Sequence, residues 1–107
     1  MIKHDVRELV FARDFYVCQK CGNNENLGIA HRIKQGHGTI NYIKKFVMKK
    51  YNLTLKKYQI LEIINDPLNL VVACNGACND SFNIFNKPVQ RDELIIKILY
   101  KLGFCNG

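Results

Sequence analysis

The chain has 107 residues, 16 Lys and Arg against 9 Asp and Glu, and a formal net charge of +7. Its 48% hydrophobic and 23% charged residues are typical of a globular protein and argue against intrinsic disorder. No apolar run approaches the roughly 20 residues that span a bilayer, and the polar start of the chain does not resemble a secretory signal. These features predict a single cytoplasmic domain with no membrane contact, and the basic excess favours a polyanionic partner.

Short elements separated by turns are expected in the first third of the chain. Val6, Leu9 and Val10 share one helical face, which predicts a short amphipathic helix. The elements expected before Gly36 are, in chain order, a helix over residues 4–13, a strand or extended segment over 15–17, a polar turn over 23–26 and a strand over 27–31.

Longer helical patterns follow. Beyond Thr39, a plausible N-cap, apolar residues recur at 40, 43, 46 and 47 and lysines occupy the outer face, as in an amphipathic helix. Asp66 precedes a proline, which ends a second helical pattern. The elements expected here are helices over residues 39–51 and 55–64, a strand over 68–73, a helix after Cys78 and a helix over 91–102.

Four of the five cysteines form two close pairs. Two residues separate Cys18 from Cys21 and three separate Cys74 from Cys78, with turn-forming residues between them. Zn²⁺ takes four tetrahedral ligands, and a short turn directs two thiolates at one point. The spacing predicts a structural four-cysteine zinc site whose metal is needed for folding. A disulfide framework and buried free thiols are weaker interpretations. Cys105 has no partner and is expected to have no role.

The two cysteine pairs also locate three polar residues. The first pair leads into a strand that ends at His31, the second strand opens near Asn69, and Asn79 directly follows the second pair. A zinc ion joining these segments would bring the three residues around one cleft. Taken one at a time, they are also read as a strand-end histidine, a turn residue and a helix N-cap.

Two runs of sequence carry a resemblance to a known family. The runs CQKCGNNENLGIAHRI and PLNLVVACNGACND resemble the zinc-stapled branch of the HNH endonucleases, in particular its short phage-type members. The resemblance covers about residues 7–84, with a helical insertion at about 39–66. It implies an α+β fold, a small ββα-metal (His-Me finger) core with a structural four-cysteine zinc site and added helices. One domain over residues 1–107 would end in the helix at 91–102.

The resemblance further implies a metal-dependent endonuclease that hydrolyses phosphodiester bonds in double-stranded DNA. His31 would be the general base that takes a proton from water. Asn69 would tie the long loop to the hairpin and orient His31. Asn79 would bind a catalytic Mg²⁺ or Mn²⁺, an H-N-N variant of the motif. A second registration makes His31 a metal ligand and puts Arg32 at the base position, but arginine stays protonated.

Ala30 departs from the family pattern. Many members carry aspartate before the catalytic histidine, where it binds the metal, and alanine cannot ligate. Asn79 would then need help from Asp80, His37, water or the substrate phosphate, while His4 is not expected to be a ligand. The departure keeps an alternative open, a catalytically degenerate zinc module that binds nucleic acid.

Basic residues outside the motif are candidates for contacts with a DNA backbone. Arg32 can grip a phosphate beside the metal. The insertion adds a basic surface made of Lys44, Lys45, Lys49, Lys50, Lys56 and Lys57. Each of these residues can also be interpreted as a solvated surface charge. RNA is kept as an alternative target, and a protein partner or a homodimer as a further partner. The expected location is the cytoplasm of a bacterium or of a phage-infected host.

Overall fold

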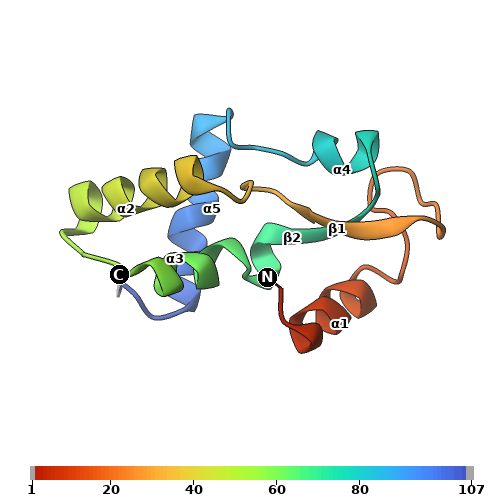
Figure 1. The fold of residues 1–107 in the computed structure, drawn as a ribbon, viewed down its shortest axis with the longest axis horizontal. Helices are drawn as coiled ribbons and strands as arrows, with labels where there is room; N and C mark the ends of the chain where they lie inside the picture. Colours follow the sequence, from red (N-terminus) through yellow and green to blue (C-terminus); the bar gives the residue numbers. More distant parts are fainter. Residues whose placement is uncertain (1, 106–107) are drawn as a thin grey trace.

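The computed structural model describes residues 2–105 (Figure 1). Strands β1 (Leu27–His31) and β2 (Leu70–Cys74) form an antiparallel ribbon in which Leu27 pairs with Cys74 and His31 with Leu70. The helices are α1 (His4–Arg13), α2 (His37–Tyr51), α3 (Lys57–Ile64), α4 (Ala77–Ser81) and α5 (Pro88–Lys101), with a short 3-10 helix η1 (Pro67–Asn69) before β2. The predicted α+β class is therefore confirmed, as a small compact fold with a two-stranded sheet.

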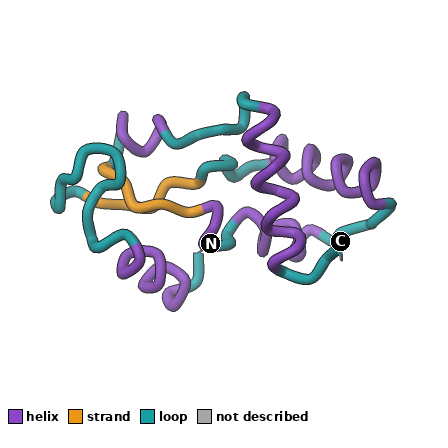
Figure 2. The backbone as a smooth tube through the Cα atoms, turned by 180° about the vertical axis from the view of Figure 1, so that it is seen from behind, coloured by secondary structure: helices purple, strands orange, loops and turns teal. Residues whose placement is uncertain are grey.

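The buried side chains divide the molecule into two lobes, which Figures 1 and 2 show at opposite ends. The helical lobe, made of α2, α3 and α5, holds the large apolar core. The ribbon lobe, made of α1, β1, β2, α4 and the loop over residues 14–26, holds two small cores. On one face of the ribbon Leu70 and Val72 pack against Val10 of α1, and on the other Ala30 packs with Cys18. None of the helices described is long and apolar enough to cross a membrane.

The predicted apolar faces are right for α5 and only partly right for α1. Four residues of α5 predicted to face the core are buried: Leu94, Ile95, Ile98 and Leu99. In α1, Val10 is fully buried but Leu9 is 58% exposed. The narrow ribbon covers only one stripe of α1, so the predicted three-residue face is too wide.

Several element ends differ from the predictions. α2 begins at His37, so Thr39 is not its N-cap; the Thr39 hydroxyl is buried in the first turn without a hydrogen-bond partner among the described residues. α5 begins early, at Pro88, because proline is tolerated in the first helical turn. β2 begins two residues later than predicted because the Asp66 carboxylate accepts the Leu68 N–H at 2.9 Å and caps η1.

The segment before the first cysteine pair is a turn and not the predicted strand. Phe15 and Tyr16 both have a left-handed backbone, with φ of 58° and 56°, so the chain cannot run extended. The Tyr16 N–H donates to Phe11 O at 3.0 Å and closes the turn. The chain then returns to the ribbon, where the Gln19 N–H donates to Val72 O at 3.0 Å.

Replacement of Phe15 by glycine should stabilise the protein. A left-handed backbone costs a bulky residue roughly 1 kcal/mol or more, and the Phe15 side chain is 82% exposed, so its removal loses little burial. Glycine's freedom in the unfolded chain offsets part of the gain, which leaves about 0.5–1 kcal/mol. Urea unfolding of Phe15→Gly and Phe15→Val checks this. The valine variant should be destabilised, and equal stability of the two variants would argue against strain at this turn.

Candidate metal centre and adjoining pocket

Arg13 and Asp14 fasten the first cysteine loop to the ribbon. The buried Asp14 carboxylate accepts the Val72 N–H at 2.9 Å and two bonds from the Arg13 guanidinium at 2.9 and 3.0 Å. Arg13 also donates to Leu70 O at 2.6 Å. Burial alone would raise the pKa of Asp14, but the Arg13 and Val72 donors outweigh it and hold that pKa below its ordinary value. The loop that carries Cys18 is thereby fixed beside β2.

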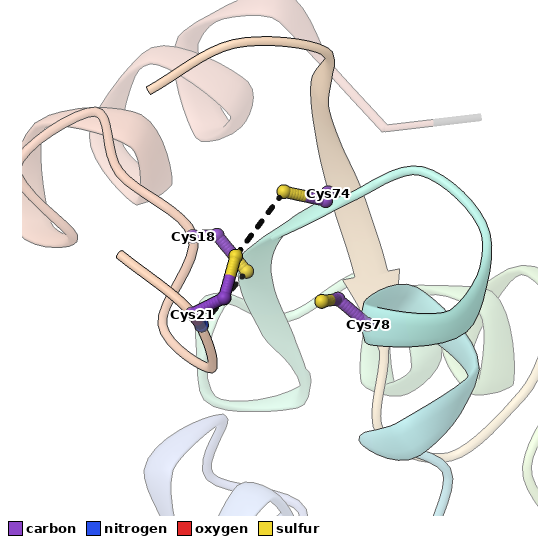
Figure 3. Close-up of side chains that lie close together, drawn as sticks. All are labelled: Cys18, Cys21, Cys74 and Cys78. Atoms are coloured by element: carbon purple, nitrogen blue, oxygen red, sulfur yellow. Dashed lines mark hydrogen bonds between the residues drawn. The ribbon is translucent and has the colours of Figure 1, made fainter. Parts of the chain in front are cut away.

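The four paired cysteines converge on one point (Figure 3). All four Sγ atoms lie within 4.8 Å of one another, and those of Cys21 and Cys74 are 3.5 Å apart. Sulfur atoms around tetrahedral zinc, each about 2.3 Å from the metal, lie about 3.8 Å apart, whereas a disulfide needs about 2.05 Å. The cluster therefore has the donors and spacing for a structural metal such as zinc, and the predicted grouping is confirmed. Cys105 lies outside it, against the helical core.

The thiols of the cluster differ in how readily they ionise. Burial opposes ionisation of Cys18, but backbone N–H groups, those of Cys21 and Lys20 among them, outweigh it and lower the Cys18 pKa to about 6. The hydrogen bond between the two sulfurs, donated by the Cys74 thiol to Cys21, raises the pKa of Cys74 to about 12, together with burial and the nearby Cys18 charge. Burial also raises the pKa of Cys78. A metal bound by four thiolates must displace these protons, so its affinity should increase with pH.

A cavity of about 300 Å³ lies beside the end of β1. It brings His31, at the end of that strand, together with Asn79 and Asp80 of α4. Its other walls come from β1, the segment after it and the segment after α4, through Ile29, Lys34, Gln35 and Asn83. Two of the three residues expected around one cleft, His31 and Asn79, thus line the same pocket, and Asn69 does not.

His31 is half-buried and held by two amide side chains. Its Nε2 lies 3.0 Å from Asn65 Oδ1, an oxygen that can only accept, so this bond forms in the tautomer that carries its hydrogen on Nε2. The Gln35 amide nitrogen lies 3.3 Å from Nδ1 and 2.9 Å from Nε2. Burial lowers the pKa of His31, and the Asn65 oxygen only partly opposes the shift. The lowered pKa favours the neutral ring, and in the tautomer that donates to Asn65 the lone pair is on Nδ1.

Oxygen donors occupy the α4 side of the pocket. Asn79 Nδ2 makes a long, 3.5 Å contact to Ile29 O, which leaves the Asn79 amide oxygen available. Asp80 supplies the pocket's carboxylate, and in residues 2–105 that carboxylate belongs to no ion pair. Amide and carboxylate oxygens suit a hard divalent cation such as Mg²⁺ or Mn²⁺. Ala30 is fully buried, and His37 is exposed at the start of α2 and does not line the pocket.

Asn69 holds the two lobes together from inside. Its side chain is fully buried, and Oδ1 accepts the Ile33 N–H at 2.7 Å. Its Nδ2 donates to Ile33 O at 3.0 Å and to Ile64 O at 2.7 Å. These bonds join the chain after β1 to the end of α3. These are bonds of the kind expected of a tie between the loop and the hairpin. Asn69 does not line the pocket that His31 and Asn79 share, and its expected role in orienting His31 stays a prediction.

The basic candidates lie away from the pocket. Arg32 lines a separate hollow with Gln90, Glu93 and Lys97 of α5 and does not line the pocket of His31, and its contact with a phosphate stays a prediction. The six candidate lysines of the insertion are all exposed: Lys44, Lys45, Lys49, Lys50, Lys56 and Lys57. Four of them lie along α2, and the other two open α3.

Sequence reasoning missed Asn65, Gln35 and Lys34. Asn65 follows α3, in the insertion, and reaches His31 only because the chain folds back through η1. No spacing signal marks such a contact. Gln35 and Lys34 follow His31 closely, and their nearness to it was the available signal.

The chain was compared with protein-family models, with curated proteins and with solved structures, and none of the three comparisons found a match. No family is therefore assigned, and the function proposed below rests on the metal centre, the pocket and the resemblance of the motif.

Proposed function

We propose that this protein is a metal-dependent DNA endonuclease in which His31 activates water. The observation that carries the proposal is the shared pocket, in which a neutral histidine faces the oxygen donors Asn79 and Asp80. The order of ribbon and helix around it, with the four-cysteine cluster beside α4, agrees with the HNH-like motif. A ββα-metal core is part of this proposal.

The residues of the pocket have different roles in this proposal. His31 accepts a proton from water through the lone pair on Nδ1. This water replaces the Gln35 amide group beside Nδ1. Asn79 and Asp80 hold the Mg²⁺ or Mn²⁺, so that Asp80 supplies the carboxylate that Ala30 cannot. When bound, the cation stabilises negative charge on the phosphate and the leaving oxygen.

Zinc at the four-cysteine cluster has a structural role in this proposal. The second cysteine pair joins the end of β2 to α4, which carries Asn79 and Asp80. The first pair lies in the loop that Asp14 fixes to β2. A metal between the pairs therefore fixes the α4 side of the pocket relative to the ribbon that carries His31.

The exposed lysines of α2 and α3 are proposed to track the DNA backbone. Contacts of this kind position a protein without reading sequence. They weaken as salt rises because phosphate binding releases counterions.

Plasmid nicking tests the function. Zinc-loaded wild type should nick supercoiled plasmid in Mg²⁺ or Mn²⁺ and not in EDTA, and His31→Ala should be slower by at least about 100-fold, the usual contribution of a general base. His4→Ala, a change at an exposed histidine of α1, is the matched control and should cut at the wild-type rate. Equal rates for wild type and His31→Ala would rule out the proposed base.

The second candidate function is a degenerate zinc module that binds DNA without cutting it. Ala30 favours it, because the pocket lacks the carboxylate expected at that position. Plasmid that is bound by the wild type but never nicked, in either metal, would select this function.

A further inference from the structure

One cation at the pocket has no anionic partner among the described residues. Lys34 lines the cavity with His31 and Asn79. Within residues 2–105 its ammonium group makes no ion pair, and the other charged residue that lines the pocket, apart from the titratable His31, is Asp80. The carboxylate and the ammonium therefore both remain free to bind ligands of opposite charge.

The Lys34 ammonium is placed by an aromatic ring. Its Nζ lies 4.9 Å from the centroid of Phe85, a cation–π contact that holds the charge without neutralising it. Tyr42 packs edge-on against the Phe85 ring at 5.9 Å, and Arg91 lies 5.6 Å from its centroid. The Ile84 N–H donates to Arg32 O at 2.7 Å, which fixes the Phe85 segment beside the chain that carries Lys34.

Arg32, the residue expected to hold a phosphate, is directed elsewhere. It lines the hollow on α5 that also contains Glu93 and Lys97. Of the two basic residues that follow His31 most closely, only Lys34 lines the pocket.

We propose that Lys34 binds the phosphodiester that enters the His31 pocket. The ligand class is a nucleic-acid phosphate, whose oxygens accept a charge-assisted hydrogen bond from the ammonium group. Asp80 repels the same phosphate unless a divalent cation lies between them. Without that cation, the attraction for the phosphate comes from the Lys34 ammonium group. This inference rests on the proposed function and names the residue that holds its substrate in place.

Binding of a small phosphodiester tests the inference apart from cleavage. The probe is a thymidine dinucleotide with one phosphodiester, titrated into ¹⁵N-labelled, zinc-loaded full chain without added Mg²⁺ or Mn²⁺. Shifts in the wild type should concentrate at pocket residues such as Ile29 and Asn83. Lys34→Gln should raise the dissociation constant about tenfold, the loss of one charge-assisted bond, and Lys34→Arg should restore most of the binding.

The matched control is Lys97→Gln, an equal loss of charge at an exposed lysine of the neighbouring hollow. It should change the dissociation constant less than twofold. Shifts centred on Arg32 and Lys97, or a Lys34→Gln variant that binds like the wild type, would overturn the inference. Binding that depends on Lys34 without plasmid nicking would leave the inference standing and remove the nuclease. Nicking at the wild-type rate in Lys34→Gln would instead keep the nuclease and remove the inference that Lys34 holds its substrate.

Discussion

Chelation of the metal proposed for the four-cysteine cluster should unfold the ribbon lobe while the helical lobe stays folded. The helical core holds twelve buried residues, whereas the two cores of the ribbon hold three each. So small a core does not offset the conformational entropy of its chain, and metal-binding energy at such a site is folding energy. The prediction that metal loss unfolds the whole domain is thus narrowed to one lobe.

Amide hydrogen exchange with and without a zinc chelator, under reducing conditions, measures this effect. Protection should be lost in β1, β2, α1 and α4 and kept in α2, α3 and α5. Far-UV circular dichroism should fall only in part, because α1 and α4 contribute 10 and 5 helical residues against 15, 8 and 14 in the other three.

Two serine variants complete the experiment. Cys18→Ser should abolish stoichiometric zinc and reproduce the chelated state. Cys105→Ser changes the one cysteine outside the cluster and should keep both zinc and protection. Loss of protection across all helices after chelation would show that the lobes unfold as one unit, and no loss anywhere would show that the cluster needs no metal.

Short-range patterns account for what could be predicted. The cysteine pairs depend on turns two and three residues long, so spacing alone was enough to group them. The 3.6-residue repeat of α5 likewise marks its buried face, because a helix presents the same side at that interval.

Features set by tertiary packing could not be predicted. Apolar residues 15–17 have a strand-like composition, yet the contacts of Asp14 and Tyr16 bend the chain into a turn. Arg32 follows His31 directly but lies against α5, since successive side chains of an extended segment point to opposite sides. The hydrogen bond between Asn65 and His31 joins residues 34 apart, a pairing that no local pattern encodes.

Replacement of Asn69 by leucine should destabilise the protein by about 3–5 kcal/mol. Leucine is close to asparagine in size, so the change removes hydrogen bonds more than volume. It leaves the Ile33 N–H, Ile33 O and Ile64 O without their side-chain partner in a fully buried site. Each unsatisfied buried group costs about 1–3 kcal/mol. Urea unfolding of the zinc-loaded protein measures the loss, with Asn86→Leu, at an exposed asparagine, as the control. A loss below about 1 kcal/mol would contradict the predicted tie.

The same variant should slow nicking even where it remains folded. The Asn69 carbonyl accepts the Arg32 N–H at 2.8 Å and so continues the ribbon's hydrogen bonds just beyond His31. When the Asn69 side chain no longer anchors this segment, His31 can shift relative to Asn79 and Asp80, and the proposed general base would be sensitive to such small displacements. Nicking measured below the variant's unfolding transition should therefore fall while its zinc content, fixed at the far end of the ribbon, stays stoichiometric. A variant that lost zinc and activity together would instead show that Asn69 supports the whole ribbon lobe rather than the position of His31.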